Sequence, residues 1–470
     1  MIKCLILAGS MICGLMLFSE PELHEYHGYY LKLRRTRAVD RDQNVYFVGD
    51  TCDANKQSVY VTEKYNKEAR KLWERRSVSI FDVYEFSAVI APDNQGNVYL
   101  ACKSYLRLRD GAILGCVTTK YDINGRQLWV VPSGTGEMEM LDPEGMAVDS
   151  NGSIYITGRG GTPDVLSVPD YLDGEPDEDS SPHKEPNIKP ESKMELDIDS
   201  YWKRRLSYIT SDRAIITVKY DTNGRKLWTA RYRGLQNEDY WPTDVAVDDA
   251  DNVYVTGGGE TGRRTTKFVI IKYSYDGKQL WDVLYGGNAG SMHMPFASAA
   301  DGAGNTYITG WSDRSPRDRQ SDLVTTKYDT NGKQQWVARY QQSKRKAVIP
   351  TAIAVDHAGN VYVIGYMYVS RWQIHVAREG GPTKAEFVMV KYNTNGRQQW
   401  LAKYEEPESH KAWIYDLRVD AQGNTYAIGA IGSDTLIIKY DANGNEKFVK
   451  RLKTMSELLK FLSCLQLEND

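Results

Sequence analysis

Cysteine is scarce in this chain of 470 residues. It occurs at six positions, which are Cys4, Cys13, Cys52, Cys102, Cys116 and Cys464. There is no Cys-x-x-Cys pair and no Cys/His cluster with the spacing of metal ligands. We therefore predict neither a metal site nor a cofactor.

An excess of charge of one sign is missing as well. The chain has 59 Lys and Arg against 62 Asp and Glu, so its formal net charge is only -3. This balance argues against nucleic acid as a partner, because a nucleic-acid-binding surface needs a clear basic excess. The mean hydropathy of -0.54 excludes a polytopic membrane protein.

Common catalytic motifs are also lacking. The sequence contains no G-x-S-x-G elbow, no H-E-x-x-H pair and no G-x-x-x-x-G-K-[ST] phosphate loop. Its seven histidines share no motif. An enzyme with a dispersed active site at the central channel of the fold, assembled from residues far apart in the chain, stays open as an alternative.

What the sequence does contain is repetition. The stretch KYDTNGRKLWTARY at 219–232 returns as KYDTNGKQQWVARY at 327–340. Its Lys-Tyr core occurs seven times, beginning at Lys64, Lys120, Lys219, Lys272, Lys327, Lys391 and Lys439. Trp follows six of these pairs, and Phe448 follows the last. Such a period indicates a repeat architecture.

A second motif alternates with the first, as in AVDDADNVYVTG at 246–257. It also occurs seven times, with its Asp at Asp40, Asp93, Asp149, Asp248, Asp301, Asp356 and Asp420. Each pair of motifs predicts four short strands, which we call a, b, c and d. Asn-Gly or Asp-Gly joins strands c and d in every unit except the first, which has Glu68-Ala69.

Seven units of four antiparallel strands favour a closed ring, because closure leaves only short, protected sheet edges. We predict an all-β fold, a seven-bladed β-propeller over residues 20–452. The recurring Tyr and Trp are then expected to form the cores between blades. The seven Lys and seven Asp of the repeats are predicted to form a ring of buried ion pairs.

The two motifs together resemble the bacterial seven-bladed β-propeller repeat (SBBP) family over about residues 30 to 450. The resemblance implies an extracytoplasmic or surface propeller, usually without assigned chemistry, and it carries over no catalytic residue. KYDTNGRKLW also looks like the repeat of quinoprotein dehydrogenase propellers, but those rings usually have eight blades and an adjacent cysteine pair. A relative of the outer-membrane assembly scaffolds is a further alternative.

Both ends of the chain depart from the repeat. Residues 1–19 form an apolar segment after Lys3, predicted to be a signal peptide or a membrane anchor, with Cys13 as a candidate lipidation site. We therefore expect an extracytoplasmic location in the periplasm, at the cell surface or secreted, with membrane association through this segment as an option. At the other end, apolar residues at helical spacing predict a short amphipathic α-helix over 453–470.

Two features lie within the blades. Cys102 ends strand b of the second unit and Cys116 opens strand c, so a disulfide between them is one of two expectations, the other being two buried thiols. Residues 161–213 interrupt the third unit between strands b and c. The region from Asp164 to Asp199 has twelve acidic residues against three Lys, which predicts a disordered acidic insertion.

The connections suggest where a ligand binds. The a–b and c–d turns are short and uniform, whereas the b–c and d–a connections on the opposite face vary in length and sequence. Variable loops on a rigid scaffold usually carry function. The candidate binding residues on that face are Trp241, His293, Trp311, Arg314, Arg371, Trp372, His375 and Trp413. We predict a noncatalytic binding or scaffold module for a protein or glycan partner.

Overall fold

The chain forms a ring of seven antiparallel sheets in the computed structural model. The structure describes Glu457 and residues 37–453, apart from gaps at 41, 43, 53–57, 67–69, 79–87, 109–110, 134–138, 162–213, 235–237, 262–264, 287–291, 314–320, 342–346, 369–385, 407–411 and 432–433. The predicted segments 1–19 and 453–470, most of the insertion, and Cys13 lie outside the described residues.

Each sheet has four strands in chain order, and we number the sheets as blades 1 to 7. Blades 1 to 3 consist of β1 (Arg37–Val39), β2 (Val45–Cys52), β3 (Ser58–Tyr65), β4 (Lys71–Val78); β5 (Ala88–Pro92), β6 (Val98–Leu108), β7 (Gly111–Tyr121), β8 (Gln127–Ser133); β9 (Glu139–Val148), β10 (Ile154–Gly161), β11 (Ala214–Tyr220), β12 (Lys226–Tyr232). Blades 4 and 5 consist of β13 (Asp239–Val247), β14 (Val253–Glu260), β15 (Thr266–Tyr273), β16 (Gln279–Tyr285); β17 (His293–Ala300), β18 (Thr306–Asp313), β19 (Ser321–Tyr328), β20 (Gln334–Tyr340). Blades 6 and 7 consist of β21 (Ala347–Val355), β22 (Val361–Tyr368), β23 (Glu386–Tyr392), β24 (Gln398–Glu405); β25 (Ala412–Val419), β26 (Thr425–Ile431), β27 (Asp434–Tyr440), β28 (Glu446–Leu452).

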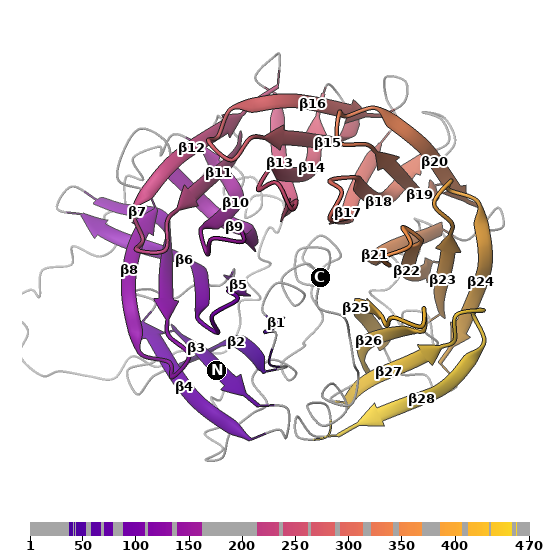
Figure 1. Cartoon of the computed structure of the whole chain (residues 1–470), viewed down its shortest axis with the longest axis horizontal. Helices are drawn as coiled ribbons and strands as arrows, with labels where there is room; N and C mark the ends of the chain where they lie inside the picture. The colour runs from indigo at the N-terminus through magenta and orange to yellow at the C-terminus, as the bar shows by residue number, and fades with distance from the viewer. Residues whose placement is uncertain are drawn as a thin grey trace, which may run out of the picture.

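Figure 1 shows the blades arranged around a central axis, with the first strand of each blade innermost and the fourth on the outer rim. The repeat motifs therefore produce the predicted architecture, a seven-bladed all-β propeller. The a–b and c–d turns share one face of the ring, which we call the turn face. The b–c and d–a connections share the other, which we call the loop face.

The turns of the turn face are built by their own side chains. In the turn after β9, for example, Asp149 Oδ1 accepts hydrogen bonds from the backbone N–H groups of Asn151 and Ser153 at 3.0 and 2.8 Å. Gly152 closes this turn with φ of +79°, a conformation that glycine adopts without strain. The recurrent D-x-x-G-N pattern is thus explained by turn geometry, as the sequence predicted.

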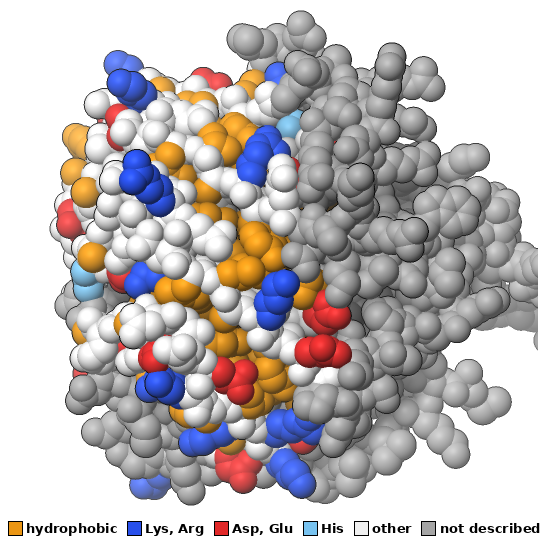
Figure 2. Space-filling model, turned by 90° about the vertical axis from the view of Figure 1, so that its right-hand side faces the viewer, with side chains coloured by type: hydrophobic (Ala, Val, Ile, Leu, Met, Phe, Trp, Pro, Cys, Tyr) orange, Lys and Arg blue, Asp and Glu red, His pale blue; other side chains and the backbone are white. Residues whose placement is uncertain are grey.

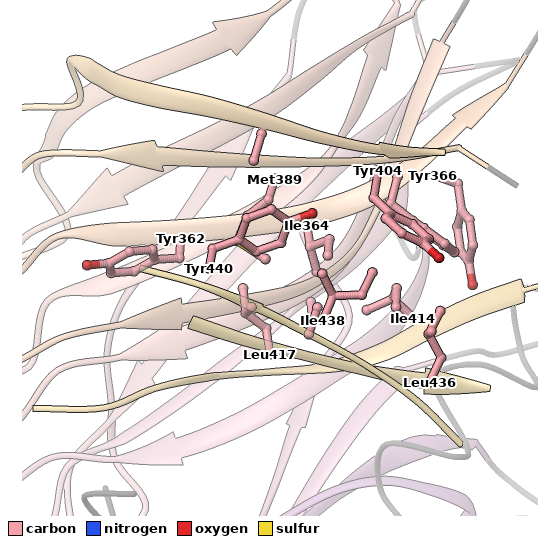
Figure 3. Close-up of a cluster of buried hydrophobic side chains, with 14 of the residues drawn as sticks. Tyr362, Ile364, Tyr366, Met389, Tyr404, Ile414, Leu417, Leu436, Ile438 and Tyr440 are labelled. Carbon is pink, nitrogen blue, oxygen red and sulfur yellow. The ribbon is translucent and has the colours of Figure 1, made fainter. Parts of the chain in front are cut away.

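Apolar side chains of neighbouring blades form the cores. Within the described residues, six hydrophobic clusters join blades 1–2, 2–3, 3–4, 4–5, 5–6 and 6–7 in turn. Figure 3 shows the cluster of blades 6 and 7, where Met389 and Tyr404 of blade 6 face Leu417 and Ile438 of blade 7. Blades 2 to 6 therefore have apolar side chains on both faces of the sheet. This explains why every residue of a strand such as β11 is buried.

In blades 1 to 6, the tryptophan of the repeat contacts the blade that follows. At the boundary of blades 5 and 6, Trp336 Nε1 donates a hydrogen bond to the Thr394 carbonyl at 2.9 Å. Its ring lies so close to Gly396 that a Cβ there would come within 2.6 Å of it. The same indole contact and glycine recur for Trp73 and Gly125, Trp129 and Gly224, Trp228 and Gly277, Trp281 and Gly332, and Trp400 and Gly444. We call each boundary between neighbouring blades a joint.

Of the two expectations for Cys102 and Cys116, the structure has the second: both are buried free thiols. The register pairs Cys102 with Val117 and Cys116 with Lys103, so the two cysteines are offset by one residue and do not face each other across the strands. Successive side chains point to opposite faces of a sheet. Cys102 accordingly belongs to the core of blades 1 and 2, whereas Cys116 belongs to the core of blades 2 and 3.

Candidate functional site

The polar residues of the repeat lie between neighbouring blades and have structural roles. In blade 3, the Lys219 amine lies 3.3 Å from the Asp149 carboxylate and 4.6 Å from the centre of the Tyr155 ring. The Tyr155 hydroxyl donates to the same carboxylate at 3.0 Å. The amine also donates to the Tyr275 carbonyl of blade 4 at 3.3 Å, so this group ties two blades together.

The same arrangement recurs around the ring. Ion pairs join Lys64 to Asp40, Lys120 to Asp93, and Lys272 to Asp248 at 3.5 to 3.9 Å. All seven repeat lysines lie over a tyrosine ring, at 4.6 to 5.2 Å from its centre. Burial lowers the pKa of Lys64, Lys120 and Lys272, and the neighbouring carboxylate opposes that shift. Ion pairs therefore join the repeat Lys and Asp in blades 1 to 4, which confirms the predicted ring of buried ion pairs for those four blades.

The loop face is different. There, polar and aromatic side chains that are not part of the two repeat motifs lie between neighbouring blades. The described candidates Trp241, His293 and Trp311 all lie there, at the start of a first strand or the end of a second. Trp413 lies at the equivalent place in β25, opposite Ala430. The remaining candidates, Arg314, Arg371, Trp372 and His375, lie outside the described residues.

The structure brings two of the predicted residues to one joint, between blades 4 and 5. Trp241 is half-buried and lies across Gly258, whose missing side chain makes room for the indole. The register places Trp241 beside Gly258 and Gly258 beside Phe268, a core residue of this joint. Trp311 instead pairs with Leu323, which belongs to the next core, between blades 5 and 6. The predicted aromatics therefore do not form one site.

His293 of blade 5 is buried against two aromatic rings of blade 4. Its ring centre lies 6.5 Å from that of Phe268 and 6.0 Å from that of Tyr285, both edge to face. Its backbone is held by Thr266, whose hydroxyl accepts from the His293 N–H at 2.8 Å. Burial, assisted by the positive charges of Arg339 and Lys267, lowers the pKa of His293 to about 4. The imidazole is therefore neutral near pH 7.

Around His293 lies a group of polar residues that crosses the joint. Arg339 donates to the Tyr285 hydroxyl at 2.9 Å and to Ser312 Oγ at 3.3 Å. Its guanidinium is 3.7 Å from the buried carboxylate of Asp322, while 37% of the arginine side chain stays exposed. We call the residues Trp241, Tyr285, His293, Asp322 and Arg339 the 4–5 cluster. It joins an aromatic platform, a neutral imidazole and a partly exposed cation.

Three members of the 4–5 cluster escaped prediction: Tyr285, Asp322 and Arg339. The sequence gives no clear signal for Asp322, since a carboxylate also stands five residues before the repeat lysine in blades 6 and 7, as Glu386 and Asp434. Arg339 is harder to find, because a basic residue three places after the tryptophan occurs in several blades. In blade 7 the equivalent Arg451 pairs with the buried Glu406, whose carboxylate also accepts from the Tyr404 hydroxyl.

Figure 2 shows the outer rim on the side of β20 and β24, where apolar side chains run in a band between scattered charges of both signs. No group of three or more His, Cys, Asp or Glu residues suited to a metal is found within the described part of the chain. In that same part, no helix has the length and the apolar character required to cross a membrane.

Together the sheets, turns and joints define the chain as a seven-bladed β-propeller. No protein-family model matches the sequence, so the resemblance to SBBP repeats stays a prediction. No curated protein matches it either.

Solved structures with a similar fold are numerous but distant. An ulvan lyase of polysaccharide lyase family PL25 aligns with a TM-score of 0.48 at 9% identity, over 91% of this chain and 94% of that one. A protein from Lactobacillus plantarum aligns with a TM-score of 0.40 at 13% identity, over 79% and 83%. A Pseudomonas brassicacearum lignostilbene dioxygenase aligns with a TM-score of 0.41 at 8% identity, over 87% and 88%. These likenesses are too weak to bear on function.

Proposed function

We propose that this chain is an extracytoplasmic, noncatalytic propeller that binds a protein or glycan partner through its loop face. The observation that supports this function is the difference between the polar residues of the two faces. The polar residues of the turn face build turns and ion pairs, whereas Trp241 and Arg339 at the loop face are partly exposed. A rigid ring with variable loops on one side suits a binding module.

The 4–5 cluster has the chemistry of such a binding surface. The half-buried indole of Trp241 offers an apolar face on which a sugar ring or a peptide side chain stacks. The guanidinium of Arg339, held in place by Tyr285 and Ser312, offers fixed donors for a carboxylate or a hydroxyl. Aromatic and arginine side chains dominate the binding energy of many interfaces.

Binding by the wild type and two single variants tests this function. Trp241→Ala removes the aromatic platform and is expected to weaken binding about tenfold or more, as a lost hot-spot residue does. Tyr275→Ala is the matched control, because Tyr275 is an exposed aromatic (64%) on the turn face. The measurement is binding to a glycan array and to proteins captured from the native envelope. Equal weakening by both variants, or by neither, contradicts the assignment of the loop face.

The same cluster supports a second candidate function, an enzyme that uses acid–base chemistry. A neutral imidazole, a phenol, a carboxylate and an arginine come together at one joint, and these groups serve as bases, acids and charge stabilisers in many enzymes. They lie between blades, not at the central channel where we had expected a dispersed site. A hydrolase and lyase screen with His293→Gln as the comparison decides, since turnover that this variant abolishes favours the enzyme.

Export and membrane association complete the proposal. They rest on the apolar segment after Lys3, which has the length of a secretory signal. The mass of the mature protein and its distribution between membrane and soluble fractions test this part. A full-length chain in the cytoplasm would contradict it.

A further inference from the structure

The joint between blades 7 and 1 differs from the other six. Figure 1 shows β1 to β4 and β25 to β28 on either side of this boundary, and these strands form two separate sheets. Among the strands that the structure describes, none from one end of the chain completes the sheet at the other end. Within the described residues, the hydrophobic clusters cover the joints from blades 1–2 to blades 6–7 and none spans this one.

The indole contact is missing here from both sides. Blade 7 has Phe448 where the other blades have tryptophan, and a phenyl ring has no N–H to donate to the turn of the next blade. Blade 1 has Glu68-Ala69 where the other blades have Asn-Gly or Asp-Gly. These two departures are far apart in the sequence, but they belong to blades 1 and 7, which flank the same joint.

The core positions of this joint depart from the pattern as well. In blades 2 to 7, the residue equivalent to Phe47 is completely buried, as with Leu100 and Ile156, whereas Phe47 is partly exposed. Glu63 stands where other blades have buried residues such as Ile271 and Val390. Its carboxylate accepts from the Tyr65 hydroxyl at 3.0 Å and pairs with Lys71 at 2.7 Å.

Blade 7 shows the corresponding change on its own flank. Lys450 is exposed and stands two places after Phe448, where blades 5 and 6 have the buried Ala338 and Ala402. Charged side chains thus replace apolar ones on both sides of the joint. Water solvates such side chains well, so closing this joint removes less apolar surface from water than closing any other.

We propose that the 7–1 joint is the place where the ring opens: blades 7 and 1 separate there, under native conditions, more readily than any other pair. The other six joints stay closed because each has an indole donor, a glycine turn and an apolar cluster. Opening exposes the flanks of blades 1 and 7 and widens the ring, which gives the loop face a second shape. The closed and open forms differ by local contacts only, as in other sub-global openings.

Native-state hydrogen exchange of the full chain, followed by mass spectrometry, tests this proposal. In the wild type, peptides from β2, β3, β26 and β27 are expected to share one opening and to exchange about tenfold faster than peptides from the equivalent strands of blades 4 and 5. Equal exchange in all seven blades would overturn the proposal.

Two variants make the test specific. Phe448→Trp combined with Glu68→Asn and Ala69→Gly restores the indole contact, and we expect it to slow exchange in β2, β3, β26 and β27 alone. Trp400→Phe removes the indole donor of the 6–7 joint and is expected to speed exchange in β22 and β23. If the restored variant does not fold, Trp400→Phe still decides, because an unchanged pattern in it shows that the indole contact does not control opening.

Discussion

At the scale of single residues, the charges of this protein are explained by position in the repeat. Asp149 accepts two backbone N–H groups of its own turn, a tyrosine hydroxyl and the charge of Lys219. Asp221 accepts two backbone N–H groups of the next turn in the same way, at 2.9 Å each, but it faces only the exposed Arg225. The two aspartates have the same turn role, and only Asp149 has a buried cation beside it.

This difference gives a prediction with its own control. Asp149→Ala leaves the buried Lys219 without its carboxylate, and removing one partner of a buried ion pair destabilises a protein by about 3–5 kcal/mol. Asp221→Ala loses turn hydrogen bonds only, which we expect to cost about 1 kcal/mol. Urea unfolding of both variants measures the two losses. Equal losses would mean that the ion pair adds nothing beyond the turn.

At the scale of strands and turns, the contact between blades is an indole against a glycine. Gly396 and Gly423 have nearly the same backbone, with φ of +75° and +78°. A Cβ at Gly396 would come within 2.6 Å of the Trp336 ring, whereas at Gly423 the nearest atom, of Ala442, is 3.4 Å away. The turn requires glycine at both places, and the joint adds a second requirement at Gly396.

Alanine at these two positions separates backbone strain from overlap. Gly423→Ala is expected to cost about 1–2 kcal/mol, the price of a left-handed conformation in a residue with a Cβ. Gly396→Ala is expected to cost a further ~1–3 kcal/mol, because the Trp336 ring must move. Melting midpoints of the two variants provide the comparison. Similar midpoints would show that the joint relaxes freely around the new methyl group.

The strands were predictable because their residues repeat, and the details that do not repeat were not. Period-2 alternation and the Asn-Gly turns identify the blades from sequence alone. The sequence left the state of Cys102 and Cys116 open because it does not give the strand register, and a shift of one residue moves a side chain to the other face of a sheet. Only part of the 4–5 cluster could be predicted, for the same reason. Trp241 and His293 are unusual residues in variable connections, whereas Tyr285 and Arg339 lie in the outer strands β16 and β20.

At the scale of the whole molecule, the ring consists of blades that each complete their own sheet. The insertion at 162–213 leaves β10 and β11 paired in register, with Gly160 opposite Ala214. Strands β9, β10 and β11 all contact the neighbouring blades. We therefore expect the ring to form without the insertion.

Replacing residues 162–213 by Asn-Gly tests this independence. We expect unchanged strand content by circular dichroism and a melting midpoint that is equal or higher, because a shorter loop lowers the entropy of the unfolded chain. A large drop in the midpoint would show that the insertion stabilises the ring. If the fold is kept, the same variant in the binding assays reports whether the acidic residues act at the loop face.

The indole contacts run in one direction around the ring, and in each of blades 1 to 6 the tryptophan contacts the glycine turn of the blade that follows. The joints are therefore head to tail, and blade 7 of one molecule presents the same flank to blade 1 of another copy as to its own. Ring closure prevails because the two flanks share one chain and meet at a high effective concentration. A circular permutant with its new ends in another d–a connection keeps every blade. Its chain break then lies at a joint that has the full indole contact.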